Sequence, residues 1–442
     1  RAEWMGDVGM IQYPASRKII SGPGKKDGDI IYSDSRLMRN MLRHTIESQQ
    51  DDGRMKAHHP SDRWDLHWYI EDYCCLWVYG LRQYYDNTAD IDFLKEAWPA
   101  LERQMKWFID RKNKCGLITA RDFLIHLDNP LRYQVCQGAT LNAFIYRAFV
   151  DSAYLAKAMG NNKQSKYYSE QAESLKDAYN KYLWDDETQT FYSAVYYPDD
   201  IKDNALPTLE LVTPQKPEER NTQWVKPGQK VIPTIQAALL ALNRGVVSEE
   251  HLPAVKKYLK THHSELMNPY THLFLFDEFY KIDTDEMDTE VLNIIRKRWN
   301  NMVSRTSPGT AAEGFETQGY LCHPFGLVPA YTLPAYVLGV HKPEPIWEKE
   351  ILIEPRLGDL KYVKGVGLTE LGPVPVEWKK TSSSELEFSF EIPKGVTATI
   401  RLPKLADNSK VKINNKKINT KEVGRFLEFK LKAGKYSGKV GN

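Results

Sequence analysis

The stretch TLNAFIYRAFVDSAYLAKAMG, residues Thr140 to Gly160, decides the fold class of this chain. Its apolar side chains recur at intervals of three and four residues, which places them on one face of a helix. Gly160 ends the pattern, as glycine often does at the C-terminus of a helix. The stretch therefore predicts one long amphipathic helix over residues 140–159.

The same spacing recurs over most of the chain before residue 340. It predicts helices over Asp29–Gln50, Tyr69–Tyr85, Asp92–Asp110, Ser165–Leu183, Thr234–Asn243, Leu252–His262, Tyr270–Lys281, Asp283–Trp299 and Phe325–Gly339. We expect Asp92 and Asp283 to begin their helices as caps. Pro329 and Pro334 are expected to kink the last helix. Strand patterns are almost absent here, apart from a possible hairpin between residues 191 and 233.

Helices in successive pairs, joined by loops of unequal length, predict an (α/α)6 barrel over residues 1–340. A helical solenoid is the other geometry for paired helices, but solenoids show a fixed sequence period. No such period is visible in this sequence. We therefore expect a six-hairpin helical domain over these residues. Because the sequence starts at Arg1 without a Met, we also expect an N-terminal part of the protein to be missing.

The character of the sequence changes at His341–Pro345, HKPEP, which is typical of a linker. Short runs that alternate between apolar and polar residues follow it, with a turn at Asn414-Asn415. This pattern predicts an antiparallel β-sandwich over residues 341–442. Lysine is abundant in this last part, and alternation on strands would place it on a solvated face.

Composition excludes several classes of function. The chain has 442 residues, 42% of them hydrophobic, with a formal net charge of +2. A balanced charge provides no strong field for nucleic acid, and no apolar run approaches the ~18 residues of a membrane span. The five cysteines lack the spacing of a metal or redox motif, so we expect no metal and no cofactor. The 11 Trp and 25 Tyr favour a carbohydrate partner, because aromatic rings stack on sugars.

The loop that opens the stretch from Gly309 to Leu338, GTAAEGFETQGYLCHPFGLVPAYTLPAYVL, carries two carboxylates, Glu313 and Glu316. Because a loop of this kind is solvated, it is a better place for catalytic residues than for a core. A second acidic and aromatic cluster, RWDLHWYIED, includes Trp64, Asp65 and Asp72. Part of it is expected to reach a pocket and part to begin a helix.

Several motifs in order resemble the bacterial α-L-rhamnosidases, glycoside hydrolase family 78. Arg1, Trp4, Gly6 and Asp7 match the second half of that family's motif Arg-x-Glu-Arg-x-x-Trp-x-Gly-Asp. Further similar segments are Arg121-Asp122-Phe123-Leu124, Gly138–Ala156, the loop 309–323, Val376-Glu377-Trp378 and Ile392-Pro393-Lys394-Gly395.

The resemblance implies an exo-acting, inverting hydrolase that releases terminal α-L-rhamnose from oligosaccharides, polysaccharides or glycoconjugates. Such a reaction needs a carboxylic acid and a carboxylate base roughly 6.5–9.5 Å apart. Aligning Phe315-Glu316 with the family's Trp-Glu makes Glu316 the base, and a gap in the alignment would select Glu313. The family's general acid precedes the residue matched by Arg1. Glu3, where the family often has glycine, is the remaining candidate within this sequence.

The resemblance also implies the residues that hold the sugar. Asp7 would bind sugar hydroxyls, Asp122 would face the sugar, and Trp4 and Trp64 would wall the pocket. Asp65 and His323 are further candidates for binding the sugar. The opening residues and the loop near Glu316 are expected to face each other across one sugar-sized cavity.

The sequence is also compatible with other carbohydrate-related functions. A glucuronyl hydrolase or a polysaccharide lyase could use the same barrel, and a lyase would need a Tyr and His pair. A carbohydrate-binding relative without catalysis would lack a titratable residue before Arg1. The compartment is also open. We expect a periplasmic or extracellular protein if a signal precedes this sequence, and a cytoplasmic one otherwise.

Overall fold

The computed structural model describes residues 3–15, 21–23, 30–32, 34–60, 70–120, 132–134, 136–197, 222–224, 228–306, 309–316, 320–341 and 349–441. The chain forms two compact units. The first comprises Arg1–Met10, Leu37–Tyr85 and Asp90–Glu278, and the second Ile11–Arg36, Asp86–Ala89 and Phe279–Asn442. The expected domain boundary at residues 340 and 341 stays a prediction.

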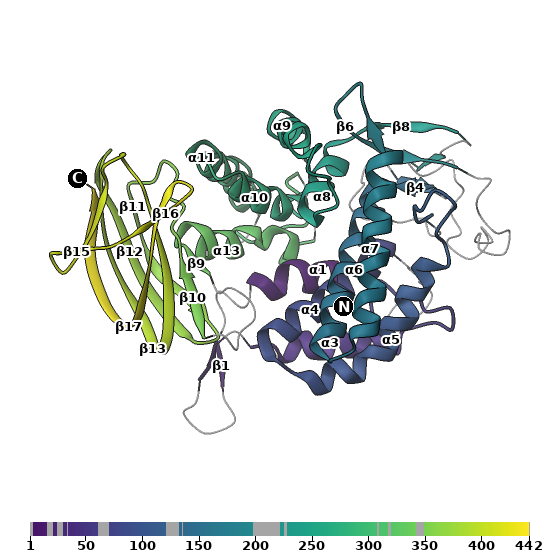
Figure 1. Cartoon of the computed structure of the whole chain (residues 1–442), viewed down its shortest axis with the longest axis horizontal. Coiled ribbons are helices and arrows are strands. Elements are labelled where there is room, and N and C mark those ends of the chain that lie inside the picture. Colours follow the sequence, from purple (N-terminus) through teal and green to yellow (C-terminus); the bar gives the residue numbers. More distant parts are fainter. Residues whose placement is uncertain are drawn as a thin grey trace. The chain divides into compact units, whose positions relative to one another are not determined.

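The first unit is built mainly from helices. These are α3 (Arg36–Glu47), α4 (Glu71–Thr88), α5 (Ile91–Ile109), α6 (Ala139–Ala158), α7 (Asn162–Tyr182), α8 (Ile235–Arg244), α9 (Leu252–His262) and the start of α10 (Thr271–Ile282). Helix α6 packs against α5, α7 and α8, and Figure 1 shows α6 and α7 side by side. The helix predicted from the opening stretch is confirmed within one residue at each end. No helix in the described part of the chain is both long and apolar enough to span a membrane.

Short strands also occur in this unit, and the antiparallel pairing of β6 (Thr190–Val195) with β8 (Lys230–Pro233) agrees with the possible hairpin between residues 191 and 233, whereas the other strands were not expected. β6 also pairs with β4 (Gln137–Gly138) and β5 (Trp184–Asp185), and β3 (Arg132–Gln134) pairs with β7 (Thr222–Trp224). These strands have two to six residues, too few to show an alternating pattern in the sequence.

In the second unit, β1 (Ser21–Pro23) pairs with β2 (Ile30–Tyr32). The helix expected from Asp29 was therefore wrong at its start, because residues 30–32 belong to β2 and α3 begins only at Arg36. Three residues of strand within a mostly helical pattern leave no separate periodic signal.

Two helix caps differ from the prediction. Helix α5 is capped by Asp90, whose Oδ1 accepts a hydrogen bond from the Phe93 amide at 3.0 Å, and not by Asp92. Helix α11 (Asp285–Ile294) is capped by Thr284, whose hydroxyl accepts from the Met287 amide at 3.2 Å. Asp283 lies before this cap with a φ of 62°. Its carboxylate binds arginines that approach from a distant part of the sequence, which no local pattern could predict.

The helical part of the second unit continues with η8 (Ile295–Trp299), α12 (Asn300–Arg305), η9 (Pro324–Leu327), α13 (Val328–Thr332) and η10 (Leu333–Val337). The helix predicted over residues 325–339 is divided among the last three of these elements. Pro329 and Pro334 lie in the first turns of α13 and η10. Each proline therefore coincides with a change of helix type, at a place where its missing amide hydrogen interrupts a continuous helix, and the predicted kinks stay a prediction.

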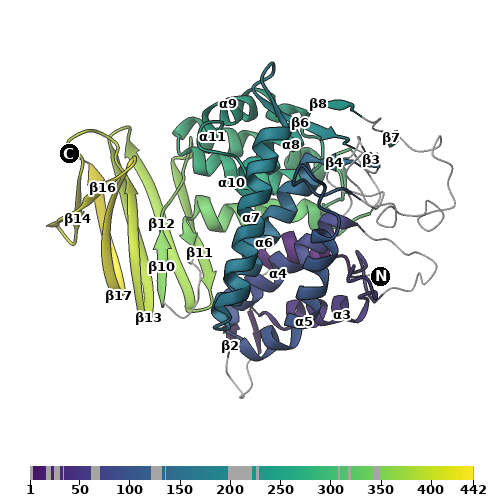
Figure 2. The ribbon, with the colours of Figure 1, turned by 45° about the vertical axis from the view of Figure 1, so that its right-hand side comes forward.

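The rest of the second unit is one sheet, seen as a curved layer in Figure 2. Its strands are β9 (Val340–His341), β10 (Glu350–Ile353), β11 (Tyr362–Thr369), β12 (Gly372–Ser382), β13 (Glu385–Pro403), β14 (Lys410–Ile413), β15 (Lys416–Ile418), β16 (Lys421–Val423) and β17 (Phe426–Gly441). The main path runs β11-β12-β13-β17-β14-β15. All pairs are antiparallel except β10 with β13. The predicted turn at Asn414-Asn415 joins β14 to β15 with left-handed φ values of 48° and 64°.

The core of the sheet is centred on Trp378, which is fully buried. Its indole nitrogen donates a hydrogen bond to the Leu338 carbonyl at 3.0 Å. Phe388 and Phe390 stack on each other with ring centroids 5.6 Å apart, and both contact the Trp378 ring. The aromatic cluster therefore joins the sheet to the end of the preceding helical segment.

A charged cluster links α11 to the sheet within the same unit. Arg425 donates to Asp283 at 2.8 Å and to the buried Asp288 at 2.5 Å, and it also pairs with Asp285. Burial raises the pKa of Asp288, although the Arg425 charge works against that shift. Asp283 also binds Arg356. The arginine therefore neutralises a carboxylate that is only 1% exposed.

Replacing Arg425 by glutamine should lower the free energy of unfolding by about 3 kcal/mol, because it leaves the buried Asp288 carboxylate without its cation. Equilibrium urea unfolding would measure the change. Arg296→Gln is the matched control, since the Arg296–Asp359 pair is about half exposed on both sides and should contribute at most about 1 kcal/mol. Equal losses in the two variants would contradict this account.

Candidate functional site

The opening segment of the first unit is anchored by backbone and ring contacts. Trp4 precedes the short helix α1 (Met5–Asp7) and forms an isolated antiparallel bridge with His58. The Met5 amide donates to the Ala57 carbonyl at 3.2 Å. The Trp4 ring lies 4.2 Å from the His58 ring and meets Tyr73 edge-on at 6.4 Å. Trp4 is therefore held in one orientation, as a residue that walls a pocket would need to be.

Gly6 has a packing reason to be glycine. A Cβ atom at this position would lie 2.2 Å from the Tyr73 ring, far inside contact distance. The glycine of the Trp-x-Gly-Asp motif thus lets the chain pass close to an aromatic ring. That approach brings the next residue, Asp7, into the interior, where it is 8% exposed.

Buried polar groups surround Asp7. The hydroxyl of Tyr270, a residue that is fully buried, has a pKa raised well above its ordinary value. Burial is the main cause, and the negative charges of Asp72 and Asp7 add to it. The guanidinium of Arg244, 5% exposed and 4.9 Å from the Phe274 ring, acts on Tyr270 in the opposite direction.

Sequence reasoning missed Tyr270 and Arg244. Both lie in segments that read as ordinary helix, so no local pattern separates them from core residues. The structure describes only the last three residues of the acidic and aromatic cluster, Ile70, Glu71 and Asp72. Helix α4 begins at Glu71, and Asp72 is buried and acts on the pKa of Tyr270. Trp64, Asp65 and Asp122 lie outside the described residues, and their predicted roles remain predictions.

Glu3 has a different environment. Its Oε2 lies 3.0 Å from Nδ1 of His44, and its side chain is 39% exposed. A carboxylate held by a neighbouring histidine at the surface is sufficiently explained as a local ion pair. The position therefore offers little support for Glu3 as the acid.

The loop with Glu313 and Glu316 belongs to the second unit and is firmly packed. Ala312 bridges to Leu321, and the His323 amide donates to the Ala311 carbonyl at 3.2 Å. Phe315 is buried and meets the Trp299 ring edge-on at 4.9 Å. Gly326 lies against the same loop, where a Cβ would come within 2.7 Å of Ala311. The backbone around the two glutamates is thus held by tertiary contacts.

The two glutamates differ in their surroundings. Glu313 is half-buried and makes no hydrogen bond or ion pair to another residue in the described part of the chain. Burial alone raises the pKa of its carboxyl. Glu316 has a side chain that is 75% exposed and lies 3.8 Å from Arg305. Only Glu313 combines partial dehydration with the absence of a countercharge.

His323 has a local role. Its Nδ1 accepts a hydrogen bond from the Phe325 amide at 3.3 Å, and its ring meets the Phe325 ring edge-on at 4.6 Å. The residue therefore caps η9 and orients the loop that precedes it. Its predicted place in a sugar pocket stays a prediction.

The candidates thus fall into two sets, one in each compact unit. Glu3, Trp4 and Asp7 belong to the first unit, and Glu313, Glu316 and His323 to the second. Among the described residues, no group of three or more His, Cys, Asp or Glu side chains could hold a metal ion.

The sequence profile of the bacterial alpha-L-rhamnosidase 6 hairpin glycosidase domain matches residues 28–268, which is more than half of the chain. This chain belongs to the bacterial α-L-rhamnosidase six-hairpin glycosidase family. A second profile, of the bacterial alpha-L-rhamnosidase C-terminal domain, matches residues 339–417. No curated protein matches the chain.

Solved rhamnosidases have a similar structure. An alpha-L-rhamnosidase from Dictyoglumus thermophilum has a TM-score of 0.73 and 18% identity, over 100% of this chain and 46% of that chain. A family 78 rhamnosidase from Bacillus sp. GL1 has a TM-score of 0.72 and 19% identity, and the match covers 91% of this chain and 39% of that chain. An α-L-rhamnosidase from Streptomyces avermitilis, complexed with L-rhamnose, has a TM-score of 0.62 and 13% identity. The match covers 99% of this chain and 38% of that chain. The chain spans less than half the length of each.

These likenesses confirm the predicted fold class, a six-hairpin helical fold followed by a largely antiparallel sheet domain. The resemblance of the sequence motifs to the bacterial α-L-rhamnosidases is confirmed as well. The family is one of glycoside hydrolases.

Glu313→Gln should make the stability of the protein less sensitive to pH. The folded state holds the Glu313 proton more tightly than the unfolded chain, whose glutamates titrate near 4.5. The wild type therefore loses stability as the pH rises from that value through the raised folded pKa. The variant should have a higher melting temperature than the wild type at pH 7, and the gain should vanish below about pH 4.5.

Differential scanning calorimetry at several pH values would measure this effect. Glu316→Gln is the matched control, because its side chain is largely in water, and its melting temperature should follow that of the wild type. A gain for Glu313→Gln that is the same at all pH values would contradict the burial of an ionisable carboxyl.

Proposed function

We propose that this chain carries out the exo-acting hydrolysis of terminal α-L-rhamnosides with inversion, and that Glu313 is the general base. The observation that supports the proposal is a half-buried carboxyl without an ion pair among the described residues, on a loop segment held by packing contacts, in a chain of the α-L-rhamnosidase family. The family relative that was solved with L-rhamnose supports the choice of sugar.

The chemistry assigns a task to each part of the proposed site. An inverting hydrolase activates a water molecule with a carboxylate base while an acid protonates the leaving oxygen. A carboxyl pKa raised toward the working pH makes a better base, and partial burial provides that shift at Glu313. Glu316 lacks this environment and lies beside Arg305. We assign the acid to the residue that precedes Arg1 in the family motif.

The opening segment would bind the sugar. Asp7 is buried beside a polar cluster, and a carboxylate in such a place can accept hydrogen bonds from two adjacent hydroxyls of a pyranose. Trp4, held by His58 and Tyr73, offers a ring face or edge to the apolar side of the sugar.

Kinetics on p-nitrophenyl α-L-rhamnoside would test the assignment of the base. The protein should be produced together with any natural sequence that precedes Arg1. Glu313→Gln should lower kcat by about 10²- to 10⁴-fold, the usual contribution of a general base. Glu316→Gln, the matched isosteric change on the same loop, should keep kcat within a factor of about three.

The possible results separate the hypotheses. A large loss for Glu316→Gln alone would return the base to the position favoured by the family alignment. Full activity in both variants would exclude both glutamates. No hydrolysis of any rhamnoside by the wild type would contradict the proposed function and favour a carbohydrate-binding relative.

The stereochemistry of the product gives a separate test. Proton NMR during the first minutes of the reaction should show β-L-rhamnose as the first sugar released, before mutarotation produces the α anomer. Inversion follows from attack by water on the face opposite to the leaving group. The α anomer as the first product would show retention and would require a nucleophilic carboxylate in place of a base.

A further inference from the structure

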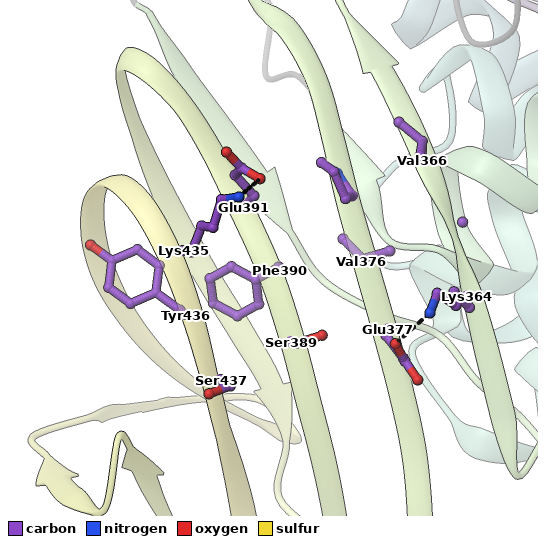
Figure 3. A pocket seen from close by; sticks show the side chains of 12 residues that line it. Lys364, Val366, Val376, Glu377, Ser389, Phe390, Glu391, Lys435, Tyr436 and Ser437 are labelled. Carbon is purple, nitrogen blue, oxygen red and sulfur yellow. Dashed lines mark ion pairs between the residues drawn. The ribbon is translucent and has the colours of Figure 1, made fainter.

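A groove crosses the outward face of the C-terminal sheet, with a volume of about 480 Å³. Its lining comes from four neighbouring strands: β11, β12, β13 and β17. Figure 3 shows an ion pair on each side, Lys364 with Glu377 and Lys435 with Glu391. Phe390 belongs to the buried core on the opposite face of the sheet, and Tyr436 packs against that core. The side chains on the groove's own face are therefore mainly charged or small and polar, such as Lys364, Glu377, Ser389, Glu391, Lys435 and Ser437.

A row of basic residues continues this face beyond the groove. Residues two positions apart on a strand point to the same face, so Lys379 shares the face of Glu377, and Lys439 that of Ser437. The register pairs Lys379 with Glu387, Glu387 with Lys439, Lys439 with Lys412, and Lys412 with Lys417. Four lysines thus lie in one cross-strand row over β12, β17, β14 and β15.

Two of these lysines lack a direct ion pair, although the charge of Lys412 acts on the Glu385 carboxylate. Lys439 pairs with Glu385 at 2.7 Å and Lys379 with Glu387 at 3.7 Å. Lys412 and Lys417 make no ion pair with any residue in the described parts of the chain. Like charges directly opposite each other on a sheet are destabilising. The row therefore costs stability in the folded protein, and an anionic ligand would relieve that cost.

The charge of the chain is divided unevenly along its length. Lysine and arginine outnumber aspartate and glutamate in residues 349–441, whereas acidic residues outnumber basic ones in residues 1–348. The net charge of +2 for the whole chain hides this division. The sheet domain therefore carries a net positive charge, which favours an anionic ligand.

We propose that this face, the groove together with the lysine row, binds the backbone of a uronic-acid polysaccharide. Adjacent strands are roughly 4.8 Å apart, close to the length of one pyranose unit. Carboxylates on successive sugars could therefore meet Lys439, Lys412 and Lys417, which lie on the successive strands β17, β14 and β15. Tyr362 and Val366, each about half exposed on the same face of β11, provide apolar surface for the sugar rings. The choice of a glycan over other polyanions rests on the proposed function.

Biolayer interferometry with immobilised polygalacturonate would test the proposal on the whole chain. The wild type should bind, and the affinity should fall as salt screens the charges. Lys412→Gln/Lys417→Gln should weaken binding about three- to tenfold, as expected for the loss of two exposed charge contacts. Lys163→Gln/Lys257→Gln removes two exposed lysines from the helical unit and should leave the affinity unchanged.

The other outcomes would overturn the proposal. Equal losses in both double variants would show a diffuse charge effect with no role for this face. Equal or tighter binding to dextran sulfate or to polythymidylate at the same charge concentration would show a general polyanion surface. Polygalacturonate contains no rhamnose to release, so this binding and the hydrolysis of rhamnosides can fail independently.

Discussion

The cost of removing charged side chains from water is the constraint on which this structure depends. Most of its buried charges are compensated. Arg111 donates to the fully buried Glu71 at 2.8 Å and lies over the Trp107 ring. Asp151, also without exposure, sits between Arg82 and Arg147, and Arg425 neutralises Asp288. Such pairs contribute little net stability, because Coulomb attraction is offset by desolvation, but removing one partner is costly. They therefore fix which segments can pack together.

Against this background, charges without partners stand out. Glu313 is partly dehydrated with no cation beside it, and Lys412 and Lys417 repel each other on an exposed sheet face. Neither arrangement favours folding. Perturbed carboxyls are typical of functional sites, and clustered basic side chains are typical of a surface that meets an anionic partner. The proposed catalytic base and the proposed glycan surface follow from the same physical argument, applied to opposite charges.

Sequence reasoning succeeded where a signal is repeated many times. The helix over residues 140–159, the pairs of helices around it and the strands after residue 349 all follow from periodicity, since a dozen or more side chains point to the same answer. It failed where one or two tertiary contacts decide. Asp283 looked like a cap, but two arginines from the sheet domain hold its carboxylate, and Thr284 begins the helix. Short strands such as β2 leave too few residues for a pattern.

The motifs by themselves determined the family, the order of the two kinds of secondary structure and the short list of acidic candidates. Those properties are local, or are carried by residues in a fixed order along the chain. Only the tertiary structure distinguished Glu313 from Glu316, and only it revealed Tyr270, Arg244 and the lysine row. The reason is that burial, countercharge and cross-strand register arise between residues far apart in the sequence. Three positions along a loop separate a half-buried carboxyl from an exposed one, and no pattern of residue types records that difference.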